Sequence, residues 1–138
     1  MKNSVVLVAL VLALTWLPGW VQAETVEGTV QGFTCVTAGK VCPVGKEDPM
    51  IASEKIFVIL TMEKGKYYFV PNVDRAVLAR HINQMVRVTG RIDPNYPSIR
   101  AEKLEVMEKA PSWQTTWSTA MQEETDAWIR QFYEQLPE

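Results

Sequence analysis

The fold is decided by residues 70–93, VPNVDRAVLARHINQMVRVTGRID, where the spacing of apolar residues changes from helical to strand-like. In the first half, Val73, Val77 and Ile82 recur on one helical face, and Asn72 stands before them as an expected N-cap. In residues 85–93, apolar residues and one glycine alternate with polar residues, which is the period of a half-buried strand. The stretch therefore predicts a helix that leads directly into a β-strand.

Strand patterns lie on both sides of this stretch. Before it, residues 24–34, 55–63 and 67–71 are rich in β-branched and aromatic residues or alternate apolar with polar ones. After it, residues 99–107 form the last predicted strand, in which the apolar positions move from odd to even numbers. That shift indicates a β-bulge near residues 102–103. The chain is therefore expected to be mainly β, with five strands and one helix between the third and the fourth.

This order resembles the OB-fold, a five-stranded Greek-key barrel. The resemblance rests on EGTVQGF (residues 27–33), on residues 70–93 and on IRAEKLEV (residues 99–106), and it covers about residues 24–109. In particular, the helix running into VRVTGRID is similar to the junction found in small exported bacterial OB-fold domains. The resemblance implies an exported protein of the binding or stress-associated kind. The long first loop and the C-terminal tail depart from the minimal pattern of that family.

The resemblance also implies a ligand face on the second and third strands, beside the loops of residues 35–54 and 94–98. The aromatic side chains expected there are Phe57, Tyr67, Tyr68 and Phe69. Such rings can stack on bases. The alternative is that they only fill the barrel, since about half of them must point inward. Residues 24–109 carry 12 basic and 11 acidic side chains, and this balance does not favour nucleic acid.

The chain begins with the layout of a secretory signal peptide. Lys2 precedes an unbroken apolar run over residues 5–14, and Val21-Gln22-Ala23 supplies a cleavage site of mostly small residues. The alternative is a membrane anchor, but the run is shorter than the roughly 20 residues that cross a bilayer. We expect residues 1–23 to be removed and the rest to be exported, to the periplasm or outside the cell. The remaining chain is long enough for one domain.

The only two cysteines are Cys35 and Cys42. In an exported protein, such a pair within a segment rich in turn residues is typical of a disulfide that stiffens a loop. A redox-active pair and a pair of metal ligands are the alternatives. A thioredoxin-like centre would have the C-x-x-C spacing. A structural zinc site would have four ligands, whereas the chain has a single histidine. We expect no metal and no cofactor.

Two further groups of polar residues give weaker signals. His81 lies on the apolar flank of the predicted helix, which favours a structural role. Glu47 and Asp48 form an acidic pair in a loop, and such pairs are usually solvated. No Ser–His–Asp arrangement with a recognisable motif is present. We therefore assign no catalytic residue.

Residues 110–138 form a tail in which apolar residues recur at intervals of three and four, and this predicts a long amphipathic helix from Ser112. The predicted stripe consists of Trp113, Trp117, Met121, Trp128 and Phe132. Residues 112–138 carry five acids and one base, which argues against binding to anionic lipid. We expect the stripe to be buried, either against the barrel or against a partner protein, because Trp and Met are favoured at interface centres.

Together these features favour an exported, non-catalytic binding or accessory module that engages a protein partner. One alternative is a redox protein that cycles the Cys35–Cys42 pair. Another is an oligosaccharide- or nucleotide-binding OB domain.

Overall fold

The computed structural model describes residues 22–42 and 52–135. The predicted signal peptide falls almost entirely outside the described residues, and so does the loop segment 43–51 with Glu47 and Asp48. Within the described residues, the chain forms six antiparallel strands and three helices. The mainly β class predicted from the sequence is confirmed, and so is a helix between the third and the fourth strand.

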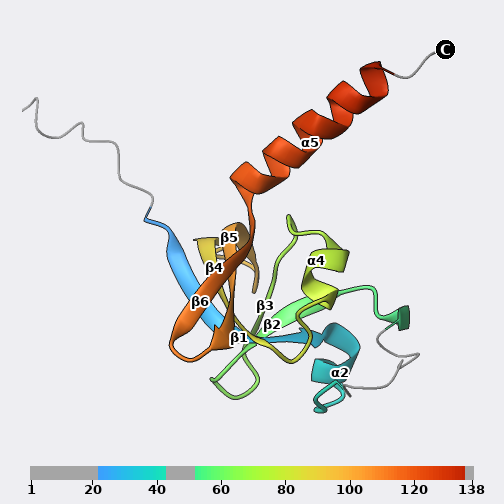
Figure 1. The fold of residues 1–138 in the computed structure, drawn as a ribbon. Coiled ribbons are helices and arrows are strands. Elements are labelled where there is room, and N and C mark those ends of the chain that lie inside the picture. The colour runs from blue at the N-terminus through green and yellow to red at the C-terminus, as the bar shows by residue number, and fades with distance from the viewer. Residues whose placement is uncertain (1–21, 43–51, 136–138) are drawn as a thin grey trace, which may run out of the picture.

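The strands form one open sheet with the order β3-β2-β1-β4-β5-β6. Figure 1 shows this sheet and a long C-terminal helix that leaves it at one end. The strands are β1 (Glu24–Gly32), β2 (Phe57–Thr61), β3 (Tyr67–Phe69), β4 (Met85–Ile92), β5 (Ile99–Lys109) and β6 (Ser112–Ser118). The helices are α2 (Phe33–Thr37), α4 (Arg75–Ala79) and α5 (Thr119–Glu134). The predicted count of five strands is wrong, because β6 pairs with the far edge of β5.

The edge strand β3 approaches the start of β5, although the sheet is not closed. Phe69 donates its backbone N–H to the carbonyl oxygen of Pro97 at 2.8 Å, and it forms an isolated parallel bridge with Ser98. Further along the chain, the side chain of Asn72 bonds to the backbone of Ala101 twice: Nδ2 donates to the carbonyl oxygen at 2.7 Å, and Oδ1 accepts from the N–H at 2.8 Å. The Asn72 amide therefore takes the place of a neighbouring strand, and the arrangement is compatible with a barrel-like fold.

Asn72 is not the helix N-cap that the sequence predicted. Asp74 is the cap of α4, and its carboxylate accepts a hydrogen bond from the backbone N–H of Ala76 at 2.6 Å. Aspartate is as good a cap as asparagine. Because the Asn72 side chain is bonded to Ala101 of β5, it is not free to cap the helix, and the next polar residue along the chain, Asp74, caps it instead.

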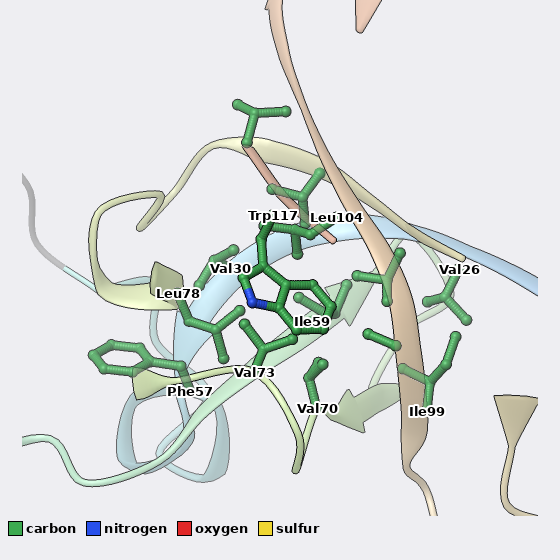
Figure 2. Packing of buried hydrophobic residues seen from close by; sticks show 14 residues of the cluster. Val26, Val30, Phe57, Ile59, Val70, Val73, Leu78, Ile99, Leu104 and Trp117 are labelled. Carbon is green, nitrogen blue, oxygen red and sulfur yellow. The ribbon is translucent and has the colours of Figure 1, made fainter. Parts of the chain in front are cut away.

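Most of the buried apolar side chains gather on one face of the sheet (Figure 2). Every strand except β3 supplies a fully or largely buried member, and Trp117 of β6 lies in the middle of the cluster with Leu78 of α4 near its edge. Burial of one such side chain contributes about 1.5–3 kcal/mol. No residue of α5 belongs to this cluster. The core of the described residues is therefore built without the C-terminal helix.

The predicted bulge between β4 and β5 is confirmed. Thr89 pairs with Lys103 while Gly90 pairs with Ala101, so Glu102 is the extra residue. A β-carbon at position 90 would collide with the backbone of Arg100 on β5, which explains a glycine at this point of the strand. The bulge brings Leu104 and Val106 onto the core face together with Ile99 and Ala101.

Residues 112–118, which were predicted to start the tail helix, form strand β6 instead. Trp113 and Trp117 lie four residues apart, and this spacing fits one face of a helix and one face of a strand equally well. Pairing with β5 satisfies the backbone groups of both segments and so selects the strand. The helix consequently begins at Thr119.

A β-bulge in β6 places the two tryptophans differently. Trp117 pairs with Leu104 and Thr115 pairs with Glu105, so Thr116 is the extra residue between them. The bulge lets Trp117 enter the core, where 5% of its surface is exposed. In a regular strand, residues four apart would share a face; the extra residue breaks that rule here.

Trp113 is half-buried outside the core cluster. The guanidinium carbon of Arg87 lies 4.1 Å from the centroid of its ring, in cation–π contact. The same guanidinium pairs with Glu27 at 3.0 Å and with Glu105 at 3.9 Å. Trp113 is thus held by a charged cluster on the sheet and takes no part in a helical stripe.

Candidate functional site

α5 is anchored to the sheet through its first turn. The hydroxyl of the N-cap Ser118 accepts a hydrogen bond from the backbone N–H of Met121 at 3.2 Å. Trp117 donates its indole N–H to Oε1 of Gln122 at 3.2 Å, and Gln122 donates in turn to Asp126 at 2.9 Å. Because Trp117 belongs to the core, these bonds set the direction in which α5 leaves the sheet.

The remaining turns of α5 project away from the sheet (Figure 1), and none of its residues is buried. Five large apolar side chains are exposed: Met121 by 45%, Trp128 by 64%, Ile129 by 39%, Phe132 by 50% and Tyr133 by 67%. We call these five residues the α5 stripe. The rings of Trp128 and Phe132 stack with centroids 5.8 Å apart, and Phe132 meets Tyr133 edge to face at 6.1 Å. The rings cover one another only in part and leave a continuous apolar surface.

The charged residues of α5 lie mostly on the side opposite the stripe. At 3.6 residues per turn, Met121, Trp128 and Phe132 share one side of the helix, whereas the carboxylates of Glu123 and Asp126 lie across from them. An exposed apolar patch with a polar surround marks an interaction site in a soluble protein. The α5 stripe is therefore the strongest candidate functional surface on the described residues.

The predicted tail stripe is divided by the structure. Trp117 is buried in the sheet and Trp113 lies beside Arg87, so neither belongs to the α5 surface. Packing of the helix against the barrel was one of the two expectations, and it is wrong for Met121, Trp128 and Phe132.

Sequence reasoning missed Ile129 and Tyr133, which widen the stripe on one flank. They lie four residues apart, and Ile129 is four residues after Thr125. A second row at this i, i+4 spacing could have revealed them.

The predicted ligand face is divided by the alternation of side chains along the strands. Tyr68 pairs with Ile59 and packs against the core, and Phe57 is itself a core residue. Tyr67 and Phe69 lie on the other face, because they pair with Leu60 and Val58. The four aromatic side chains therefore do not form one surface.

Tyr67 and Phe69 form a three-ring cluster with Phe33 of α2. The ring centroids are separated by 5.2 Å for Phe33–Phe69, 5.6 Å for Tyr67–Phe69 and 5.7 Å for Phe33–Tyr67. All three side chains are half-buried. Their faces are engaged with one another, which leaves less ring surface for stacking on a ligand.

A groove of about 370 Å³ lies between the end of β3, the start of β2 and α4. Its lining includes Phe57, Val73 and Leu78, with Lys55 and Arg75 as the charged residues. The guanidinium of Arg75 lies 5.4 Å from the centroid of the Phe57 ring. Arg75 also donates to the carbonyl oxygens of Glu54 at 2.7 Å and Ala52 at 3.2 Å. Arg75 thus ties α4 to the segment before β2.

A second groove, of about 440 Å³, lies at the opposite end of the β2–β3 hairpin and includes Tyr68 and Ile92. Lys66 lies beside it and pairs with Glu63 at 3.0 Å. The bond to Glu63 and then the proximity of Tyr68 raise the pKa of Lys66 above its ordinary value. Lys66 is therefore charged at neutral pH.

Cys35 and Cys42 form a disulfide, with their Cα atoms 5.6 Å apart, and both residues are buried. The bond joins α2 to the start of the loop that leads to β2. The pairing expected for a staple is therefore present, and a disulfide is consistent with an oxidising compartment such as an exported protein meets.

A buried polar network holds the Cys42 end of this staple. The side chain of Gln31 accepts a hydrogen bond from the backbone N–H of Cys42 at 3.0 Å and donates to Asn83. Asn83 donates to the carbonyl oxygen of Cys42 at 2.7 Å. The backbone N–H of Gly32 donates to the sulfur of Cys42 at 3.2 Å. Gln31 is 2% exposed, and its bond to the Cys42 N–H is shielded from water, whereas the bonds of Asn83 are partly buried.

The other end of the 43–51 segment is held by Glu54. Its carboxylate accepts hydrogen bonds from the backbone N–H groups of Thr34 at 3.0 Å, Lys55 at 3.1 Å and Ile56 at 3.3 Å. Both stems of the segment are therefore fixed to the same region around the end of β1 and α2.

His81 lies in the turn after α4 and not, as was predicted, on the flank of the helix, and its Nδ1 is 2.7 Å from Oε1 of Gln84. In residues 22–42 and 52–135, no three His, Cys, Asp or Glu side chains gather in a way that could hold a metal ion. Over the same residues, no helix has the length and apolar character needed to cross a membrane.

Comparison of the chain with protein-family models, with curated proteins and with solved structures found no match. The function of this protein must therefore be inferred from its own residues.

Proposed function

We propose that this chain is an exported, non-catalytic binding module in which α5 docks a protein partner. One observation carries the proposal: α5 has no buried residue, yet it exposes five large apolar side chains, of which Met121, Trp128 and Phe132 share one side. Leaving such a surface in water is costly, because each aromatic side chain gains roughly 1.5–3 kcal/mol when fully buried. A partner that covers the stripe would recover much of this free energy.

The anchoring of α5 supports a docking role over that of a loose tail. Its first turn is fixed to the core through Trp117, Ser118 and Gln122. A partner therefore meets a helix that is already formed and held in one direction. A preformed helix loses less conformational entropy on binding than a disordered segment, and this favours affinity.

We further propose that the sheet is an OB-type barrel with β6 added at its edge. The strand order, the position of α4 between β3 and β4, and the bridge from Phe69 to Ser98 support this assignment. The end of β3 also lies beside the start of β5, where the Asn72 bonds to Ala101 lie, and contacts of this kind would help to close a sheet into a barrel. β6 and α5 are then the additions through which the domain acts.

Export is supported by two independent features. The first is the signal-peptide pattern of residues 1–23, and the second is the buried disulfide between Cys35 and Cys42. The redox alternative has less support, because thiol–disulfide exchange needs an accessible sulfur and both cysteines are buried. The oligosaccharide- or nucleotide-binding alternative also has less support, since Tyr68 points to the core and Tyr67 packs against Phe33 and Phe69.

The proposal is tested by comparing the native size of the protein in an envelope extract with that of two variants. One lacks residues 119–138 and the other carries Trp128→Glu. Both are expected to migrate as a smaller species than the unaltered protein. Trp128→Glu should also keep the unfolding midpoint, because the core contains no residue of α5, whereas the deletion removes Gln122, the partner of the Trp117 indole. A Glu123→Gln variant, altered on the opposite side of the helix, should migrate like the unaltered protein. Identical native sizes for all four proteins would contradict a docking role.

A further inference from the structure

We infer that the partner covering the α5 stripe is the α5 of a second copy of this chain, packed antiparallel to the first. The inference rests on the proposed function and names the occupant of the same surface. It follows from the spacing of the stripe, the sizes of the facing side chains, the position of the charges and the area available.

The spacing along α5 is that of a two-helix seam. Met121, Thr125, Trp128 and Phe132 follow one another at intervals of four, three and four residues. This is the a/d pattern of a coiled coil, in which each side chain inserts between residues of the facing helix. The hydroxyl of Thr125 donates to the carbonyl oxygen of Met121 at 2.9 Å, so it can lie in an apolar seam without an unmet hydrogen bond.

The side chains of the seam fit an antiparallel copy better than a parallel one. Antiparallel pairing about the middle of the seam places Met121 against Phe132 of the second copy and Thr125 against its Trp128. Each layer then combines a large ring with a smaller side chain, which is how well-packed interfaces fill space. Parallel pairing would instead place Trp128 against Trp128 and Thr125 against Thr125.

The charges also permit a second copy. Glu123, Asp126 and Glu134 lie away from the seam, and only Glu124 flanks it. In the antiparallel arrangement, Glu124 faces the neutral Gln131 of the second copy, so no like charges meet directly. α5 still carries four acids and one base, Arg130. The two helices therefore repel each other only through their net negative charge and not through a direct contact of like charges. Added salt should weaken this repulsion.

The area available is that of a weak, transient interface. A fully buried aromatic side chain covers roughly 150–250 Å², and the exposed fractions of Met121, Trp128, Ile129 and Phe132 therefore leave roughly 400 Å² of apolar surface on each copy. Tyr133 lies outside the seam, so two copies would bury roughly 800 Å² in total, at the low end of the range for protein–protein interfaces. The dimer is thus expected to be reversible, with dissociation in the micromolar range.

The attachment of α5 gives a further reason for the antiparallel orientation. The sheet is joined to the first turn of the helix, so parallel pairing would bring both sheets to the same end of the helix pair. Antiparallel pairing places them at opposite ends and also opposes the two helix dipoles.

Sedimentation equilibrium of the purified protein tests the inference. We expect a monomer–dimer equilibrium across the micromolar range that strengthens as salt is added. Trp128→Glu should raise the dissociation constant about thirtyfold or more, since central aromatic residues dominate interfaces. Glu123→Gln should leave the dimer at least as strong. A purified protein that stays monomeric throughout, or a Trp128→Glu dimer as strong as the original, would overturn the inference.

The orientation is tested by oxidative cross-linking of Met121→Cys and Phe132→Cys proteins whose native disulfide is intact. A mixture of the two should give a covalent dimer, and each variant alone should give little. Cross-linking of Met121→Cys with itself would overturn the antiparallel arrangement. A monomeric purified protein whose α5 cross-links to a different protein in the envelope would overturn the second copy as occupant and leave the proposed docking function standing. If the purified protein forms no dimer and α5 cross-links to no other protein, the proposed docking function is contradicted as well.

Discussion

Trp117 donates its indole N–H to the side-chain oxygen of Gln122 at 3.2 Å, and this bond joins the core of the sheet to the first turn of α5. One residue thus belongs to two structures: its ring fills the core, and its polar atom orients the exposed helix. Substitutions in the core should therefore change the stability of the protein, whereas substitutions on the exposed side of α5 should change only its assembly.

Trp117→Ala should lower the free energy of unfolding by about 3–5 kcal/mol, because it empties the middle of the core. Trp113→Ala should cost only about 1 kcal/mol, since it removes a partly exposed cation–π contact with Arg87. Urea unfolding of the two variants checks this difference. Equal losses would mean that the two tryptophans share one environment, as a helical stripe would require.

Asn72→Leu should lower the free energy of unfolding by about 2–4 kcal/mol, because the backbone N–H and carbonyl oxygen of Ala101 would both lose their partner. Asn72→Asp keeps an acceptor but places a carboxylate oxygen against the carbonyl oxygen of Ala101, so its loss should be at least as large. Asn95→Leu in the exposed turn before β5 serves as the control and should change stability by no more than about 0.5 kcal/mol. Chemical denaturation measures all three, and an Asn72→Leu value within the range of the control would contradict the account of the sheet edge.

Cys35→Ser and Cys42→Ser should each lower the free energy of unfolding by about 2–4 kcal/mol, because the disulfide restricts the unfolded chain. Dithiothreitol should destabilise the unaltered protein by a similar amount and have no effect on a variant with both cysteines replaced. Thiol labelling of the native, exported protein should find no free cysteine. Stoichiometric labelling of both residues would rule out the staple.

Thr116→Val should stabilise the protein by about 1 kcal/mol. The hydroxyl of Thr116 is buried in the β6 bulge without a hydrogen-bond partner, and valine has the same shape without the polar atom. The neighbouring Thr115 is exposed, so Thr115→Val should have little effect. Thermal unfolding compares the two, and a clear loss of stability in Thr116→Val would show that the hydroxyl has a partner after all.

The sequence predicted β1 to β5 and a helix between β3 and β4, because each depends on local patterns, although α4 is shorter than the predicted helix. The alternation in residues 85–93 and the bulge near Glu102 both follow from side-chain spacing along the chain. The five-residue helix α2 was missed, since so short a segment has no measurable period. Asn72 shows a different limit: the residue has the chemistry of a cap, but its bonds to Ala101 depend on a strand 29 residues away.

The candidate site was only partly predictable for the same reason. A spacing of four residues between Trp113 and Trp117 cannot distinguish a helix from a strand, and the available edge of β5 decides between them. The stripe beyond Thr119 was recognisable because Met121, Trp128 and Phe132 keep helical spacing over several turns. Whether that stripe packs on its own sheet depends on the direction of α5, which Trp117 and Gln122 set through a contact that the sequence does not reveal.

Photo-cross-linking in cells that produce the protein tests the docking role of α5 most directly. A photoreactive amino acid is placed at position 128 in the stripe or, as the matched control, at position 123 on the opposite side of the helix. We predict a cross-linked species from position 128, with the mass of two copies of this chain, and little or none from position 123. No cross-link from position 128, or equal cross-linking from both positions, would contradict the claim that the α5 stripe is a docking surface.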